Sequence, residues 1–386
     1  MLKITDIDFK DQIVLLRTDY NVPIKNGAVT DDARIRASLE TIKYIVNAGA
    51  GQIIIISHLG RPEGKVVEEM RLTPVAKKLS ELLGINVPKL DDCIDVKIPN
   101  ERIVLLENLR FHPEEEANDD FFARKLAVNA DVFVNDAFSD CHRAHSSMVQ
   151  IPKLLPSCAG FQLIREVINL NLENIAKPAV AVMGGSKVST KIGLIQNMLK
   201  KVDIILIGGA MMFTFLKAMG FEVGKSRYEE DNVATAKKLL KENKKRIVLP
   251  IDAVVADKIE EGAKARNASI ENIRKDDIGV DIGEATVRYY NQILDGAKTV
   301  IWNGPMGIIE IDAFARGTEE IALHISQLKA TTIAGGGETI SVIDKLKIGN
   351  KFTFVSTAGG AALEFLEGKE LPGLKALEDS EKKFEQ

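Results

Sequence analysis

The chain has 386 residues, more than one hydrophobic core usually serves, so two domains are expected. Its net charge of −4 and its 5% aromatic content argue against a chain-wide nucleic-acid-binding surface, which would need many cations or stacking rings. Three scattered cysteines, an N-terminus unlike a signal peptide and the lack of any run of about 18 apolar residues predict a cytoplasmic protein.

Short apolar runs rich in Val and Ile recur along the chain and predict strands. They cover residues 13–16, 53–56, 103–106, 132–134, 180–183, 204–207, 247–249, 299–302, 331–334 and 352–355. The runs are nearly continuous rather than alternating, which is typical of a parallel sheet covered on both faces. Helical stretches at 33–48, 72–83, 192–200 and 232–241 lie between them, and this alternation predicts an α/β fold.

A boundary is expected where Pro152, Pro156 and Gly160 interrupt the pattern. The first domain then covers 1–160, a joining helix covers 161–176 and the second domain covers 177–369. The halves share no sequence repeat, so any similarity between them would lie in their architecture.

The strands of the first half are followed by polar and cationic residues. Because ligands bind beyond the carboxyl ends of parallel strands, these residues are candidates for one site. The cationic set is Arg17, Arg34, His58, Arg61, Arg110 and Arg143. Each arginine could instead form a structural ion pair, but repetition at successive strand ends favours a small anion with two phosphates, or with a phosphate and a carboxylate. Asp19 and Asn21 could bind hydroxyls or form a turn before Pro23.

The strands of the second half are followed by glycines instead. Glycine lets the backbone approach a ligand and can leave amides facing phosphate, so a nucleotide site is expected. The segment 184–191 follows a strand and is expected to open a helix with Lys187 and Lys191 on one face. It matches neither the Walker A spacing nor the dinucleotide fingerprint, and a plain connection with solvated lysines is the alternative.

Two acidic residues accompany the later glycine turns. Glu338 follows Gly335–Gly337 and could hold magnesium on a nucleotide, or could simply be an acid favoured by a helix N-terminus. Glu310 could meet a ribose hydroxyl or lie on the surface. The run from Cys141 to His145 contains two histidines, but further zinc ligands at a workable spacing are not evident.

Taken together, these motifs closely resemble the phosphoglycerate kinase family, nearly end to end. The segments that carry the resemblance are 17–23, 57–62, 107–112, 135–138, 142–147, 184–191, 302–307, 313–318, 335–339 and 371–373. The resemblance implies two Rossmann-like, three-layer domains with parallel sheets, separated by a cleft and joined by a helix, with the tail from about residue 370 to 386 returning to the first domain. It also implies a monomeric, hinge-bending enzyme of glycolysis and gluconeogenesis.

The resemblance implies the reaction and its residues as well. The enzyme would transfer the acyl phosphate of 1,3-bisphosphoglycerate reversibly to Mg-ADP, giving 3-phosphoglycerate and ATP, with Mg²⁺ as the cofactor. The substrate positions are Asp19, Tyr20, Asn21, Arg34, His58, Leu59, Gly60, Arg61, Arg110 and Arg143. The nucleotide positions are Lys191, Gly208, Gly209, Glu310, Gly336, Gly337, Glu338 and Thr339. Arg34, Lys187 and Lys191 would stabilise the transferring phosphoryl group.

The chain departs from the family pattern at two positions. Glu338 stands where the family usually has Asp, which could shift the magnesium contact by one methylene. Ala358 stands where the family usually has Gly, and would be strained if the position needed a positive φ. A nucleotide-linked dehydrogenase and a non-catalytic binding protein are the alternatives to the kinase.

Overall fold

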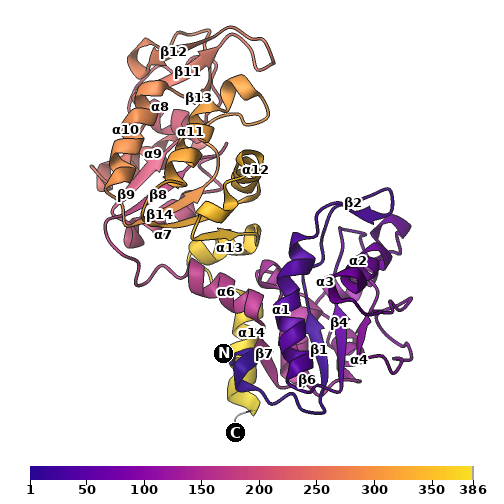
Figure 1. Ribbon diagram of the computed structural model, residues 1–386. Helices are drawn as coiled ribbons and strands as arrows, with labels where there is room; N and C mark the ends of the chain where they lie inside the picture. Colours follow the sequence, from indigo (N-terminus) through magenta and orange to yellow (C-terminus); the bar gives the residue numbers. More distant parts are fainter. Residues whose placement is uncertain (385–386) are drawn as a thin grey trace. The chain divides into compact units, whose positions relative to one another are not determined.

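The structure is a computed structural model that describes residues 1–384, and it divides into two compact units. Unit 1 comprises Met1–Ile168 and residues 370–384; unit 2 comprises Asn169–Lys369. Each unit is an α/β fold built on a parallel sheet, as predicted (Figure 1). Within the described residues, no helix combines the length and the apolar character that crossing a bilayer requires.

Unit 1 contains a five-stranded parallel sheet in the order β5-β4-β1-β6-β7. Its strands are β1 (Ile13–Arg17), β4 (Gln52–Ile56), β5 (Ile103–Leu105), β6 (Val132–Asn135) and β7 (Ser157–Ala159), with a two-stranded hairpin of β2 (Ile24–Lys25) and β3 (Ala28–Val29). Its helices are α1 (Ala33–Asn47), α2 (Thr73–Leu83), α3 (Pro113–Glu116), α4 (Asp120–Ala127), α5 (Ile151–Leu154) and α14 (Pro372–Phe384), with α6 (Phe161–Leu170) crossing the unit boundary.

Both faces of this sheet are covered, which explains the continuous apolar runs. Val14 and Leu16 of β1 belong to the core that includes α1 and α2, whereas Leu15 belongs to the core that includes α4 and α5. Successive side chains of one strand therefore enter two different cores. The C-terminal helix α14 lies beside β7, and the amino group of Met1 is 2.7 Å from Glu381 (Figure 1).

Unit 2 contains a six-stranded parallel sheet in the order β10-β9-β8-β14-β15-β16. These strands are β8 (Ala179–Met183), β9 (Ile204–Ile207), β10 (Ile247–Val248), β14 (Thr299–Asn303), β15 (Thr331–Gly335) and β16 (Phe354–Ser356). The helices are α7 (Ile192–Lys201), α8 (Met211–Ala218), α9 (Val233–Glu242), α10 (Glu284–Asp295), α11 (Arg316–Ile325), α12 (Gly337–Leu346) and α13 (Gly360–Leu366).

A second sheet of unit 2 was not predicted. It is antiparallel, in the order β12-β11-β13, and its strands are β11 (Asp252–Ala256), β12 (Ala265–Ser269) and β13 (Ile278–Ile282). It is inserted between β10 and β14 and lies at one end of the unit in Figure 1. Strand β12 is largely exposed and polar, so it lacks the apolar run that identified the other strands.

The expected joining helix at 161–176 is too long, because α6 ends at Leu170. The Asn171 side chain accepts a hydrogen bond from the Glu173 amide at 3.0 Å, forming a local turn that competes with a further helical turn.

The two parallel sheets share one connectivity. If the strands of each sheet are numbered by their order in the chain, both sheets have the spatial order 3-2-1-4-5, and the sheet of unit 2 adds strand 6 at its edge. The point where the chain reverses direction across the sheet lies between β1 and β6 in unit 1 and between β8 and β14 in unit 2. Ligands of doubly wound folds bind at this point.

Candidate functional site

At the reversal point of unit 1, two buried arginines and His58 surround the Asp140 carboxylate. Arg17 Nη2 lies 3.1 Å and His58 Nδ1 lies 3.2 Å from Asp140 Oδ2, and Arg110 Nη2 lies 3.6 Å from Oδ1. Burial by itself would raise the pKa of Asp140, but the charges of His58 and Arg17 hold it well below its usual range. Asp140 therefore orders the cations and offsets only part of their charge.

The guanidinium of Arg110 uses only part of its hydrogen-bonding capacity. Its Nη1 donates to the Gly60 carbonyl at 2.8 Å, and Nε lies 3.3 Å from a Glu116 oxygen in an ion pair. Nε and Nη2 are buried, and within residues 1–384 neither has an acceptor in hydrogen-bonding geometry. Burial is the main cause that lowers the pKa of this guanidinium. An anion that supplied acceptors to these two nitrogens would relieve the cost of burying them.

Arg34, Asp19 and Asn21 lie in a second hydrogen-bonded group of unit 1. Arg34 Nη1 is 2.5 Å from Asp19 Oδ2, and the Ser139 hydroxyl donates to the same oxygen. The Asn21 amide donates to Asp19 at 3.0 Å, which is the turn considered as an alternative, while Asn21 Oδ1 accepts from the Gly60 amide at 2.9 Å. The turn thus fixes these side chains, and Arg34 remains one-third exposed.

The remaining predicted substrate residues differ in accessibility. The Tyr20 and Leu59 side chains are buried, and the Tyr20 hydroxyl is 2.9 Å from Ser38 Oγ. Their amides donate to Ser57 Oγ at 2.9 Å and to Asn108 Oδ1 at 3.2 Å, so both residues support the loops of the site. Burial raises the pKa of Tyr20 well above its usual value. Arg61 is exposed and Arg143 is half-buried, so both guanidinium groups can reach a ligand from the surface.

At the reversal point of unit 2, Lys191 meets the end of β14. Its Nζ donates to the Asn303 carbonyl at 3.2 Å and also to the Asn303 side chain. Burial lowers the pKa of Lys191 to about 8, against the opposing charge of Glu338. Lys187 is exposed in the same loop.

The expectation that both lysines lie on one helical face is wrong. Helix α7 begins at Ile192, and Lys191 is its N-cap residue. The segment before it forms a turn in which the Lys191 amide donates to Val188 and the Thr190 hydroxyl donates to Lys187. The two lysines are therefore positioned by a turn and differ strongly in burial.

The glycines beside Lys191 bring loops together instead of presenting free amides. Four of their amides donate within the protein: Gly184 to Asn303 O at 3.1 Å, Gly208 to Met183 O at 2.9 Å, Gly209 to Met306 O at 2.8 Å and Gly304 to Thr339 Oγ1 at 2.7 Å. A Cβ atom on Gly184 would lie 1.9 Å from the Pro305 oxygen. The interpretation that these amides face phosphate is therefore wrong, because loop packing already uses them.

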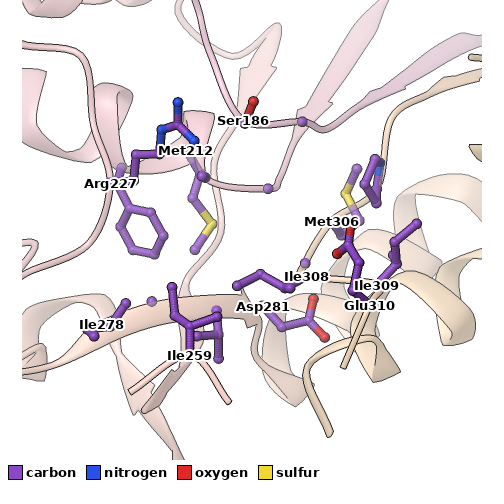
Figure 2. A pocket seen from close by; sticks show the side chains of 18 of the residues that line it. Ser186, Met212, Arg227, Ile259, Ile278, Asp281, Met306, Ile308, Ile309 and Glu310 are labelled. Carbon is purple, nitrogen blue, oxygen red and sulfur yellow. The ribbon is translucent and has the colours of Figure 1, made fainter. Parts of the chain in front are cut away.

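These loops border a cavity of about 330 Å³. Figure 2 shows Met212 and Arg227 on one side, Met306 and Glu310 on the other, and Ile278 below. Gly209 and Glu338 also line it. A largely apolar space with a few polar groups at its rim is typical of a small-molecule site and has room for a flat base and a sugar.

Asp281 forms part of the cavity wall, although the sequence did not single it out. It is buried, and its carboxylate accepts from the amides of Gly317 at 2.7 Å and Ile282 at 2.9 Å. Burial raises its pKa to about 8, because these two hydrogen bonds compensate only in part for lost hydration. Asp281 therefore supports the wall without presenting a full charge at neutral pH.

The predicted residues of α12 have three different environments. Gly336 has φ 100° and immediately precedes the helix. Glu338 follows Gly337 in the first turn and is exposed. Thr339 is buried, and its hydroxyl oxygen accepts a hydrogen bond from the Gly304 amide. Mg²⁺ bound to a nucleotide commonly keeps several waters and takes only one or two protein carboxylates besides the phosphate oxygens. The exposed Glu338 carboxylate, which lines the cavity, fits this coordination.

The second departure from the family pattern causes no backbone strain. Ala358 does not have a positive φ; that conformation falls on the next residue, Gly359, at 54°. Ala358 is buried, and its amide donates to Ser356 Oγ at 3.3 Å.

Glu229 is a further residue that the sequence analysis missed. Its carboxylate accepts the Ser189 amide at 2.9 Å and the Ser189 hydroxyl at 2.5 Å. Ser189 lies between Lys187 and Lys191, so Glu229 fixes the turn that carries both cations. The two residues are 40 positions apart, and no local motif connects them.

The fold and the two sites define a class: an α/β enzyme that handles phosphate-bearing ligands. Comparison with known proteins gives the family. The phosphoglycerate kinase family model matches residues 4–369. The curated phosphoglycerate kinase of Dictyoglomus turgidum is 50% identical, with 98% of each chain covered, and that of Pelotomaculum thermopropionicum is 47% identical, with 97% of this chain and 98% of the relative covered.

Solved structures agree with the sequence relatives. Phosphoglycerate kinase from Coxiella burnetii superposes with a TM-score of 0.92 at 41% identity, covering 98% of this chain and 99% of that one. The enzyme from Pyrococcus horikoshii OT3 gives a TM-score of 0.84 at 32% identity over the full length of both chains. The chain therefore belongs to the phosphoglycerate kinase family, which catalyses reversible phosphoryl transfer between 1,3-bisphosphoglycerate and ADP in glycolysis. The dehydrogenase alternative is wrong.

Proposed function

We propose that unit 1 holds the phosphoglycerate and unit 2 holds the Mg-nucleotide in this reaction. The observation that carries the first assignment is the pair of buried Arg110 nitrogens without an acceptor in the described chain. A phosphate or carboxylate of 3-phosphoglycerate would satisfy them. The other residues proposed to bind it are Asp19, Asn21, Arg34, His58, Arg61 and Arg143. Tyr20, Leu59 and Gly60 would shape the site, because their main-chain groups hydrogen-bond to neighbouring side chains, Gly60 to Asn21 and Arg110 among them.

The nucleotide assignment is supported by the cavity of unit 2. Its apolar part suits the adenine, and Glu310 at the rim suits a ribose hydroxyl. Lys191, with a buried stem and a reduced pKa, and Lys187 would hold the phosphates. Glu338 would hold Mg²⁺, which neutralises charge on the phosphate oxygens when bound. Gly208, Gly209, Gly336 and Thr339 would shape this site by packing. Gly337 is exposed with open space beside it, and would let a phosphate approach the start of α12.

The proposed chemistry is a direct transfer. In the direction of ATP synthesis, an oxygen of the terminal phosphate of ADP attacks the acyl phosphorus, and the bond to the carboxyl oxygen breaks. The leaving carboxylate is stable as an anion at neutral pH, and in the reverse direction it attacks without a general base. Arg34, Lys187 and Lys191 would stabilise the charge that spreads over the migrating group.

Direct transfer also requires the two ligands to meet, so a hinge-bending step remains part of the proposal. A monomeric protein in the cytoplasm is likewise proposed, as suits a glycolytic enzyme with three free buried cysteines.

A coupled assay tests the proposal. 3-Phosphoglycerate and Mg-ATP are supplied, NADH loss is followed through added glyceraldehyde-3-phosphate dehydrogenase, and Lys191→Ala is the comparison. Turnover that Lys191→Ala loses, without loss of 3-phosphoglycerate affinity, supports the division of ligands between the units. If Lys191→Ala instead weakened 3-phosphoglycerate binding and left Mg-ADP binding intact, the division would be wrong.

A further inference from the structure

Three different metal-ligand side chains meet in unit 1 away from the site described above. Asp92 and Cys93 lie in the segment between α2 and β5, and His112 follows β5 by seven residues. One ligand atom from each of the three residues lies within 4.8 Å of the other two. The chain thus brings a carboxylate oxygen, a thiol sulfur and an imidazole nitrogen together from two separate segments.

The local contacts hold these donors in place. His112 Nε2 is 2.7 Å from Asp92 Oδ1, and the Cys93 amide donates to the same oxygen at 2.6 Å. The His112 ring packs at 5.3 Å from the Phe122 ring, which limits its rotation. Little rearrangement is needed to replace the His112–Asp92 hydrogen bond with two bonds to one ion, since ligand atoms around a tetrahedral metal lie slightly further apart.

The burial of the three residues suits an ion that enters from solvent. The Cys93 side chain is 2% exposed, whereas His112 is 24% and Asp92 is 48% exposed. The sulfur therefore lies at the inner end of the cluster and the other two donors lie at its mouth. Three protein donors leave one position of a tetrahedral ion open to water, as in the open zinc sites of proteins.

The sulfur distinguishes this cluster from an ordinary ion pair. His324 and Asp295 also lie 2.9 Å apart, but among the described residues they belong to no group of three donors. Sulfur and imidazole ligands favour Zn²⁺ and similar ions over Mg²⁺, which prefers oxygen. Burial raises the pKa of the Cys93 thiol, so an entering ion must displace its proton, which a soft metal does readily and Mg²⁺ does not.

We propose that Asp92, Cys93 and His112 form a binding site for one thiophilic divalent cation of the Zn²⁺ class. The ion bonds to Asp92 Oδ, Cys93 Sγ and His112 Nε2, and water fills the remaining position. The thiol proton leaves to solvent and no oxidation or reduction takes place. Because His112 is two residues after Arg110, the ion would tie the segment that carries Arg110 to the loop at Asp92.

Co²⁺ titration of the full-length, metal-free protein tests this site. Thiolate ligation produces a near-ultraviolet charge-transfer band, and we expect that band to appear, to saturate at one Co²⁺ per chain and to be abolished by Zn²⁺. Asp92→Asn, His112→Gln and Cys93→Ala should each weaken Co²⁺ binding by about 100-fold or more. Zn²⁺ should raise the melting temperature of the parent protein and not that of these variants.

Two matched variants control for other thiols and histidines. Cys158→Ala removes a different buried thiol and His324→Gln removes the comparable histidine–carboxylate pair, and both should keep the band. A band that survives His112→Gln, or Co²⁺ binding without any thiolate band, would overturn the proposal. Asp92 and His112 are partly exposed, so their variants remain informative if Cys93→Ala fails to fold.

Discussion

The two units use one strand order to build opposite kinds of site. In unit 1 the reversal point collects charged and polar side chains: two buried arginines and His58 lie around Asp140. At the same point of unit 2 the loops pack closely: glycine amides donate to neighbouring loops, and the half-buried Lys191 donates to Asn303. The difference teaches that connectivity selects where a ligand binds, whereas the residues after each strand select which ligand binds.

The difference also predicts how each site fails. Losing Arg34, which is one-third exposed, should remove an interaction with the ligand and leave the fold of unit 1 intact. Adding a single carbon in unit 2 should disturb the fold, because the loops there are separated only by glycine hydrogens.

Arg34→Ala should have the largest effect on the reaction. We expect turnover to fall about 1,000-fold, as for other arginines that stabilise a transferring phosphoryl group, with affinity for 3-phosphoglycerate largely kept. The measurements are steady-state kinetics and a binding titration. Arg36→Ala is the control, because Arg36 lies on the same helix and pairs with Asp32 at the surface. An affinity collapse with turnover unchanged would show that Arg34 only binds substrate.

Gly184→Ala should have the largest effect on stability. A Cβ there would lie 1.9 Å from backbone oxygen, so we expect the free energy of unfolding to fall by about 3 kcal/mol, as for severe overpacking. Thermal or urea unfolding measures it. Gly296→Ala, where the nearest atom is 3.7 Å away, should change stability by less than about 0.5 kcal/mol. Equal stabilities would show that the loops can separate easily.

The charge of Lys191 should make nucleotide binding pH-dependent. Its pKa of about 8 lies below the ordinary value for lysine, so the cation is mostly present at pH 7 and is lost as the pH rises. Above pH 8, Mg-ADP affinity should therefore decrease with each further pH unit, and the decrease should approach about tenfold per unit. Calorimetry from pH 7 to 9.5 measures this, and Lys191→Arg, which stays charged, should have a flatter profile. Matching profiles would contradict the role of Lys191.

Glu229→Gln should moderately impair the kinetics with the nucleotide and leave those with 3-phosphoglycerate unchanged. Replacing the carboxylate weakens two charge-assisted hydrogen bonds to Ser189, so we expect nucleotide KM or turnover to worsen by roughly fivefold, about 1 kcal/mol, with the KM for 3-phosphoglycerate unchanged. Glu230→Gln, at the next position, is the control. A change in both KM values would indicate a general loss of structure instead.

Glu338→Asp should have the smallest effect. Glu338 is exposed and extends from the first turn of α12, so its longer side chain can adjust to a metal on the nucleotide. We expect the Mg²⁺ concentration for half-maximal rate to change by less than about twofold, because water can bridge a one-methylene gap. A much larger change would mean that this departure alters metal binding.

The local sequence predicted much of the fold. Nine of the ten predicted strands begin within one residue of an observed strand, and the tenth, predicted at 352–355, begins two residues late at Phe354. The continuous apolar runs identified them because both faces of each sheet are buried. Strands β2, β3, β7 and β11–β13 were missed. β2 and β3 have two residues each, β7 (Ser-Cys-Ala) has no run of Val or Ile, and the inserted sheet is partly exposed.

The candidate site was predicted by residue type but not by contact. The local sequence indicated Arg17, His58 and Arg110, because each stands at or shortly after the end of a strand. It gave no sign that Asp140 would order them, since Asp140 is 123 positions from Arg17. Glu229 and Asp281 were missed for the same reason, because each acts on a residue distant in the chain.

The sequence by itself determined the two parallel sheets, the cationic strand ends of unit 1, the glycine turns of unit 2 and the family. The tertiary structure alone decided which of these groups remain available to a ligand. It showed that four glycine amides are used within the protein, that two Arg110 nitrogens are left without an acceptor in the described chain, and that Lys191 is buried enough to lower its pKa. Hydrogen-bond partners and burial come from segments far apart in the chain, so no local pattern contains them.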